Sequence, residues 1–391
     1  MSFSGRYAYD QTAALSFPRL VGSEGEVRAR EYIVNEMKRL GLEVEEEEFS
    51  ASSFPTAVLA RVIMLILSAP IALSAFLYYL GRPAGALVVV TGGILFGVIA
   101  LKKLTRSFES FVKFGKTSPS KNITGRQGTK GFGNVVMMAH YDTKSQPFPV
   151  ELRIIIYLMS GIGIFGGGLG VFILSLLDLL GVSVGGGGAI FTINVFALAI
   201  SASLLFNSVN NYSDGALDNA AGVGVILGIA KAMRENPVEG LSFTYVATSA
   251  EELGLLGAEA WIKVHEKEFD RERTMFLNYD GPGAKSGPVI ALLRFGIPVR
   301  DVAGYLGEFF REVVRERKVK NAGSLYLPFG ASTDMIPAAN AGFKVLNLGS
   351  LMRGVHTRKD RIDRISAESL ELAGVIGLDV IKKFKDKIGG N

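Results

Sequence analysis

The stretch GNVVMMAHYD, residues 133–142, is an apolar run that ends in a histidine and an aspartate. An apolar run of this length, bounded by glycine before it and polar residues after it, predicts a buried β-strand over 133–140. The same pattern returns in LSFTYVATSAEE, residues 241–252, and in TMFLNYD, residues 274–280. Each run is followed by side chains that bind metals or transfer protons. These three strands therefore indicate both the fold class and the place of a functional site.

The segments between these strands predict helices. Strands that alternate with helices indicate an α/β fold, a three-layer sandwich with a mixed, mostly parallel sheet. The charged outer face of LEVEEEEF, residues 42–49, predicts a strand at the edge of that sheet. Further strands are expected over 288–293 and 343–348, and helices over 21–40, 220–234, 253–268, 299–317 and 366–387.

Four uncharged stretches hold most of the apolar residues. They explain why a chain with 20% charged residues has a mean hydropathy of +0.30. Each is long enough for a helix of about 20 residues, which crosses a bilayer core of about 30 Å. The glycines of 161–170 suit helices that pack closely in lipid. Buried helices of a large soluble domain are the alternative, but four runs of this length favour two transmembrane hairpins. The stretches are residues 62–80, 83–101, 154–177 and 179–206.

Two hairpins return the chain to the side on which it started, so all polar sequence is expected on one face of the membrane. We expect one polar domain, interrupted by hairpins over 57–101 and 154–206. Ten Lys and Arg against three Asp and Glu in 102–153 place that domain in the cytoplasm by the positive-inside rule. The net charge of +5 is mild and spread along the chain, so it does not argue for nucleic acid, and no nucleic-acid partner is expected. The domain comprises residues 1–56, 102–153 and 207–391.

Acidic residues and histidines lie just beyond the predicted strands, where α/β folds place their sites. Imidazole and carboxylate groups, in a chain with no cysteine, suit a divalent metal such as zinc. There are enough of them for two metals that share a carboxylate. Of the consecutive Glu251 and Glu252, one can bind metal while the other acts as a general base. The remaining candidates are His140, Asp142, Asp218, Asp280 and His356.

Each candidate also has an ordinary structural explanation. Asp218 precedes a helix and suits an N-cap, Asp280 precedes Gly-Pro and suits a turn, and paired glutamates suit a solvated helix start. Their shared place beyond strand ends favours a metal site, as does the presence of two of only three histidines among them. The third, His265, lies among Lys and Glu on a predicted helix and is expected to be exposed.

Five segments of the chain resemble the di-zinc exopeptidases typified by bacterial leucyl aminopeptidase and aminopeptidase S. That family also contains glutamate carboxypeptidase II and the glutaminyl cyclases. FPRLVGSEGEVRAREYIVNEMKRLGLEVEEEEF, at the beginning of the chain, also resembles the family's first helix and strand. The five segments are AHYDT at 139–143, SDGALDNAAGVGV at 213–225, SAEELGLLGAEAW at 249–261, NYDGPG at 278–283 and GVHTRKD at 354–360.

The resemblance implies a role for each candidate residue. His140 and Asp280 would hold one zinc, Glu252 and His356 a second, and Asp218 would bridge the two. Glu251 would activate a water that bridges the metals, and Asp142 would orient His140. The resemblance also implies a cis peptide bond after Asp218. Cobalt or manganese can take the place of zinc with such ligands.

The implied activity is that of a membrane-anchored aminopeptidase, which removes N-terminal residues from peptides and has the lipid bilayer as its other partner. Two alternatives stay open: a glutaminyl-cyclase-like acyltransferase, which needs one zinc, and a non-catalytic membrane scaffold on a peptidase fold. The presence of all five ligands and of Glu251 favours the peptidase. The chain departs from the family at Met335, where a histidine is common, and Tyr326 is a candidate oxyanion donor.

Overall fold

The computed structural model separates the chain into two compact units. The polar unit comprises Met1–Ser52, Thr117–Ser145 and Asn210–Asn391, and the helical unit comprises Ser53–Lys116 and Gln146–Val209. The expected domain boundary between residues 56 and 57 lies outside the described residues. The structure describes residues 3–54, 58–104, 115, 117–128, 131–296, 298–327 and 333–390.

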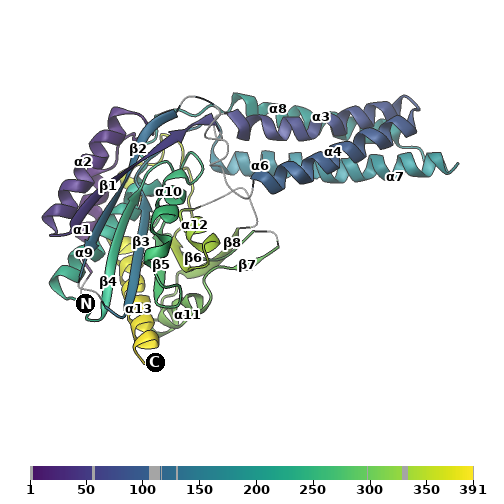
Figure 1. The fold of residues 1–391 in the computed structure, drawn as a ribbon. Helices are drawn as coiled ribbons and strands as arrows, with labels where there is room; N and C mark the ends of the chain where they lie inside the picture. The colour runs from purple at the N-terminus through teal and green to yellow at the C-terminus, as the bar shows by residue number, and fades with distance from the viewer. Residues whose placement is uncertain are drawn as a thin grey trace. The chain divides into compact units, whose positions relative to one another are not determined.

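A nine-stranded sheet forms the centre of the polar unit (Figure 1). The strands β4, β3, β5 and β9 are parallel, because helices connect them across the faces of the sheet. Across the sheet the order is β1 (Glu43–Ser52), β2 (Thr117–Gln127), β4 (Leu241–Thr248), β3 (Gly133–His140), β5 (Thr274–Tyr279), β9 (Lys344–Gly349), β6 (Val289–Phe295) and β7 (Arg300–Asp301). The ninth strand, β8 (Ala322–Leu327), pairs with β6.

The expected α/β fold is confirmed, but the expected predominance of parallel pairing is wrong for the described strands. The pairs β3–β4, β3–β5, β5–β9 and β6–β8 are parallel. The pairs β1–β2, β2–β4, β6–β7 and β6–β9 are antiparallel. The sheet is therefore parallel at its centre and antiparallel at the β1 edge. Around β6 the pairing is mixed, with β7 and β9 antiparallel and β8 parallel to it, and mixed sheets are common among large sheets.

Helices cover both faces of this sheet. On one face α10 (Leu256–His265) and α12 (Met335–Asn340) share a core with Val136, Met138 and Phe276. Strand side chains alternate between faces, and Leu277 and Tyr279 pack on the other side, beside Gly377 of α13 (Ala367–Gly389). Further helices are α1 (Gly5–Ala14) and α9 (Ala221–Glu235), which pack together, α2 (Glu24–Arg39) against β1 and β2, and α11 (Tyr305–Glu316) against α13.

The helical unit contains the four apolar stretches. Its segments are α3 (Ala60–Tyr79), α4 (Pro83–Leu104), a continuous 150–179 segment, and α8 (Gly187–Ser203). The 150–179 segment comprises α6 (Val150–Gly161), a π-helical turn η2 (Ile162–Gly167) and α7 (Gly168–Leu179). The glycines of this segment allow close packing: Gly163 lies against Ala197 of α8, and Gly167 lies against Asn194.

Five helices among the described residues are long and apolar enough to cross a membrane. Four belong to the helical unit, and the fifth, Ala216–Glu235, belongs to the polar unit and contains α9. Its most apolar window is 94% buried inside the protein. The apolar side chains of α9 are therefore explained by packing against the sheet, without contact with lipid.

The third histidine, His265, is buried, and the expectation that it is exposed is wrong. Its Nε2 contacts Glu47 of β1, and its Nδ1 lies 2.7 Å from Oε1 of Glu268. The ring centroids of Trp261 and His265 are 4.6 Å apart, and Arg126 lies 3.4 Å from Nδ1. Burial lowers the pKa of His265, but the hydrogen bonds to both carboxylates raise it more, so the net shift of the pKa is upward.

We expect His265→Gln to destabilise the polar unit by about 1–2 kcal/mol at pH 6 and by less at pH 9. A histidine whose folded-state pKa is raised stabilises the fold fully below the unfolded value of about 6.5. That contribution is lost as pH rises through the folded-state pKa. Unfolding can be followed by the fluorescence of Trp261, the single tryptophan. The control is exposed Lys267→Gln, in the short helix Glu266–Glu268 that directly follows His265. Equal destabilisation by His265→Gln at both pH values would contradict the prediction.

Candidate metal centre

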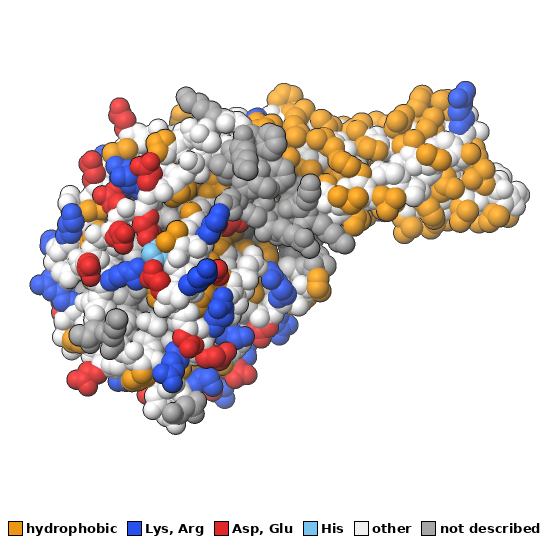
Figure 2. Space-filling model, in the orientation of Figure 1, with side chains coloured by type: hydrophobic (Ala, Val, Ile, Leu, Met, Phe, Trp, Pro, Cys, Tyr) orange, Lys and Arg blue, Asp and Glu red, His pale blue; other side chains and the backbone are white. Residues whose placement is uncertain are grey.

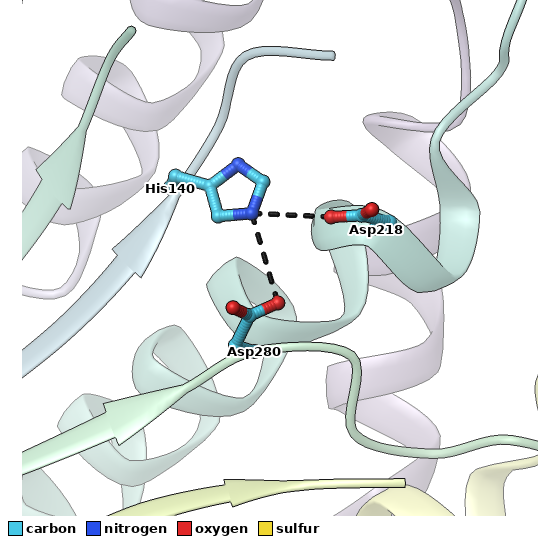
Figure 3. Close-up of side chains that lie close together, drawn as sticks. All are labelled: His140, Asp218 and Asp280. Atoms are coloured by element: carbon cyan, nitrogen blue, oxygen red, sulfur yellow. Dashed lines mark ion pairs between the residues drawn. The ribbon is translucent and has the colours of Figure 1, made fainter. Parts of the chain in front are cut away.

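Three buried side chains meet beyond the carboxyl ends of β3 and β5 (Figure 3). His140 is the last residue of β3, and Asp280 directly follows β5. Nε2 of His140 lies 3.2 Å from Oδ1 of Asp218 and 3.8 Å from Oδ1 of Asp280. One ligand atom from each residue lies within 4.8 Å of the others, so the three can hold one metal ion.

A second group forms on the other oxygen of Asp218. Nε2 of His356 lies 2.9 Å from Oδ2 of Asp218 and 3.0 Å from Oε1 of Glu252. These three residues also offer ligand atoms within 4.8 Å of one another. His356 has a φ of 59°, in the left-handed region that non-glycine residues rarely adopt. The structure thus brings together all five residues expected to be ligands, and Asp218 belongs to both groups.

Unpartnered polar atoms show that the two groups fit a divalent cation. Nε2 of His140, Oδ1 of Asp280 and Oε1 of Glu252 are buried and make no hydrogen bond within the described part of the chain. Buried polar atoms without a partner are costly and rare. Each of the three atoms faces one of the two groups, and imidazole nitrogens and carboxylate oxygens are ligands that zinc accepts.

The loop before α9 carries Asp218 into position. Gly215 has a φ of 57°, and Asp218 itself is extended, with φ −119° and ψ 88°. The peptide bond between Asp218 and Asn219 is cis, as the family resemblance implied. Asp218 is therefore no N-cap: the helical residues of α9 begin at Ala221, and the carboxylate faces the two histidines.

Asp142 holds the segment with the two glutamates. Its Oδ1 accepts a hydrogen bond from the N–H of Glu251 and its Oδ2 accepts one from the N–H of Glu252, both at 3.2 Å. Nδ1 of His140 lies 3.2 Å from the backbone oxygen of Asp142 and 3.5 Å from its carboxylate. The shorter contact to His140 is thus from the backbone, while the carboxylate positions the glutamates.

The charges of the site shift its pKa values in opposite directions. Burial raises the pKa of Glu251 well above its usual range. Burial lowers the pKa of His140, but Glu251 and the neighbouring aspartates raise it more, and the net shift is upward. Burial also opposes ionisation of Asp218, but the two imidazoles beside its carboxylate hold its pKa well below its usual range. Asp218 is thus an anion between two imidazoles, while Glu251 readily accepts a proton.

Sequence reasoning missed two charged groups here. Nζ of Lys144 lies 2.8 Å from Oε2 of Glu252 and 3.1 Å from its backbone oxygen. Asp334 is 1% exposed, and its Oδ2 accepts a hydrogen bond from Thr248. Burial raises the pKa of Asp334 to about 7. The place of Lys144, directly after AHYDT, was the available signal for it.

Met335, where the chain departs from the family, and Tyr326, the candidate oxyanion donor, both lie outside the metal groups. Met335 is fully buried in the core that α10 and α12 share. Tyr326 is 36% exposed, and its hydroxyl donates a hydrogen bond to the backbone oxygen of Gly296 at 2.8 Å. The structure therefore does not bring Tyr326 to the ligands, and it gives no support to a role as oxyanion donor.

Comparisons with known proteins agree with this geometry. The model of peptidase family M28 matches residues 203–381. Aminopeptidase YwaD of Bacillus subtilis is 30% identical over 171 residues, which are 42% of this chain and 36% of that protein. The chain thus matches little more than a third of the length of this relative.

Solved structures of two enzyme types share the fold. A glutaminyl cyclase from an Acidobacteriales bacterium has a TM-score of 0.58 and 17% identity, covering 99% of this chain and 96% of its own. BSAP, a zinc aminopeptidase from Bacillus subtilis, has a TM-score of 0.55 and 16% identity. The match covers 97% of this chain and 95% of BSAP. The resemblance is therefore confirmed for residues 203–381, which match peptidase family M28, while the solved structures show a shared fold.

Proposed function

We propose that this chain is a membrane-integral, zinc-dependent aminopeptidase that hydrolyses N-terminal residues of peptides. The observation that carries the proposal is the shared carboxylate of Asp218, which faces a separate histidine with each of its oxygens. A single metal would need only one of these groups. Two groups with one common ligand fit the arrangement of dinuclear hydrolases. The similarity to aminopeptidase YwaD supports peptides as the substrate class.

The proposed ligands fall into the two groups of neighbouring side chains described above. His140 and Asp280 would hold one zinc, Glu252 and His356 would hold the other, and Asp218 belongs to both groups. Zinc bound there supplies a Lewis acid that polarises the scissile carbonyl and lowers the pKa of water. The protein contributes fixed positions, because all of these ligand side chains except His356 are at least nine-tenths buried.

Glu251 is the proposed general base. Its carboxylate is buried, and its Oε2 lies 3.9 Å from Nε2 of His140, next to the first metal group. The raised pKa of Glu251 suits it to take a proton from the attacking water and then give it to the leaving amine. Asp142 fixes the backbone of Glu251 and Glu252 by accepting hydrogen bonds from both of their N–H groups.

The cyclase alternative remains the second candidate because glutaminyl cyclases share the fold. It needs a single zinc, whereas the described residues offer two complete groups. The third alternative, a non-catalytic scaffold, does not account for a buried Glu251 beside those groups. The peptidase uses every one of these residues and is the function that the site supports best.

The first prediction concerns Glu251. Glu251→Gln removes the proton acceptor at nearly constant volume, so we expect hydrolysis of aminoacyl fluorogenic peptides to fall at least about 10²-fold, with zinc content unchanged. Exposed Glu308→Gln on α11 is the control. Full activity of Glu251→Gln would contradict the role of Glu251 as the general base. A wild-type protein that cyclises glutaminyl peptides but hydrolyses none would favour the cyclase, and one inactive in every metal state would favour the scaffold.

The second prediction concerns the number of metals. Glu252→Gln is expected to lose one of two bound zinc ions, because it belongs to one group only. Asp218→Asn is expected to weaken both, because both groups share it. Atomic absorption after dialysis against buffered zinc measures the stoichiometry. Equal loss in the two variants would contradict the shared role of Asp218.

The helical unit supports the membrane part of the proposal. Orange, hydrophobic side chains predominate on its visible surface, with white backbone and polar groups between them (Figure 2). Val88, Leu180 and Phe196 are 73%, 70% and 68% exposed, and soluble proteins rarely expose contiguous apolar surface on this scale. We propose that α3, α4, the 150–179 segment and α8 cross the bilayer as two hairpins. With the Lys and Arg excess of residues 102–153, the polar unit then lies in the cytoplasm.

The absence of cysteine makes this topology directly testable. Single cysteines at Arg82 and Val182 report on the turns of the two hairpins, and one at Arg315 reports on the polar unit. In intact spheroplasts a membrane-impermeant maleimide is expected to label R82C and V182C, and to label R315C only after permeabilisation. The reverse pattern would overturn the cytoplasmic placement. Release of the chain from membranes by alkaline carbonate would overturn the spanning helices.

A further inference from the structure

Asp360 binds the backbone that carries the shared ligand. It is 1% exposed and lies four residues after His356. Its Oδ1 accepts a hydrogen bond from the N–H of Leu217 at 2.7 Å, and its Oδ2 accepts one from the N–H of Asp218 at 3.1 Å. Both N–H groups belong to an irregular segment before α9. Asp360 therefore supplies acceptors that regular structure does not offer there.

Asn219 binds the backbone around a second proposed ligand, Asp280. It is fully buried, and its Nδ2 donates to the backbone oxygen of Tyr279 at 2.8 Å. Its Oδ1 accepts from the N–H of Gly281 at 3.1 Å and from that of Gly222 at 2.9 Å. Tyr279 and Gly281 flank Asp280, so the side chain of Asn219 holds the backbone on both sides of that ligand.

Arg19 connects the same loop to the His140 segment. Its guanidinium is fully buried. It donates to the backbone oxygens of Tyr141 at 2.7 Å, Asp214 at 2.8 Å and Gly215 at 3.0 Å. Tyr141 follows His140, while Asp214 and Gly215 precede Asp218. The three ligand segments are therefore joined through backbone groups by side chains that are not ligands themselves.

We propose that Asp360 and Asn219 are positioning residues, which fix Asp218 and Asp280 by holding the backbone at residues 217–218 and 279–281. The inference rests on the proposed metal site. Asp142 holds Glu251 and Glu252 by the same geometry. In each case the holding side chain follows a ligand by one to four residues and binds the backbone of another ligand segment. Every ligand segment is thus tied to at least one other.

The shared ligand makes the consequence specific. Asp360→Asn keeps the volume of the side chain but turns an amide NH₂ toward one of two N–H donors, which leaves that donor without an acceptor. A shift of residues 217–218 moves both oxygens of Asp218 and so disturbs both metal groups at once. Asn219→Asp places a carboxylate oxygen against the backbone oxygen of Tyr279 and displaces Asp280.

The test uses the full chain purified in detergent, with Zn²⁺ titrated against a chromophoric chelator and Co²⁺ as the spectroscopic probe. For Asp360→Asn we expect both zinc equivalents to bind at least about tenfold more weakly, as other residues that orient metal ligands do. We also expect a changed visible spectrum of the cobalt form. For Asn219→Asp we expect at least one equivalent to weaken by a similar factor.

Two controls separate positioning from general loss of stability. Asp301→Asn replaces a carboxylate that also accepts two backbone hydrogen bonds, though with one oxygen: Oδ1 of Asp301 accepts from the N–H groups of Ala303 at 3.1 Å and Gly304 at 2.8 Å. Val313→Ala opens a cavity at the buried face of α11 and lowers the unfolding temperature. Both are expected to keep wild-type zinc affinities and cobalt spectra.

The outcomes distinguish this inference from the proposed function. If Asp360→Asn and Asn219→Asp bind two zinc ions with wild-type affinity and spectra, the positioning roles are overturned while the metal site stands. Weakening of the same size in Val313→Ala would also overturn them, because it would show that stability alone controls metal binding. A wild-type chain that binds no zinc overturns the proposed function, and this inference falls with it.

Discussion

The carboxylate of Asp218 is the group on which the rest of the site depends. Its Oδ1 lies 3.2 Å from Nε2 of His140, and its Oδ2 lies 2.9 Å from Nε2 of His356. The two histidines come from strand ends and loops more than 200 residues apart in the chain. A single buried carboxylate faces both because Asp218 lies at a non-helical position of the irregular segment before α9, and that segment has to be held in place. The sheet, the irregular loop and the hydrogen bonds around it together meet this condition.

Electrostatics favours a cation at the proposed site. Asp142, Asp218, Glu251, Glu252 and Asp280 are all buried within a few ångströms of each other. Burial and mutual repulsion raise the pKa values of Glu251 and Asp280, so the group cannot ionise fully at low cost. Lys144 offsets part of this charge at Glu252. Metal ions would offset the remainder, and the unpartnered atoms of His140, Asp280 and Glu252 already face the two groups.

The polar unit tolerates two long insertions because its own backbone pairs across both openings. Ser52, the last residue of β1, pairs with Thr117, the first residue of β2. Ser145 forms a bridge with Asn210. The chain therefore leaves and re-enters the polar unit at neighbouring residues, and each insertion closes a loop without breaking the sheet. The helical unit follows a separate rule, with glycines at its helix contacts and large apolar side chains on its surface.

Local patterns in the sequence were enough to predict the apolar strands, the polar residues beyond their ends and the four uncharged stretches. These features depend on neighbours in the chain, so His140 after GNVVMMA and Asp280 after TMFLNY were readable as site residues. Contacts between distant segments were not readable in this way. The burial of His265 between Glu47 and Glu268, the contact of Lys144 with Glu252, and the hydrogen bonds of Asp360 and Asn219 join residues up to 218 positions apart. Only the tertiary structure decided them, because which polar groups become partners depends on how the sheet and its loops bring the chain together.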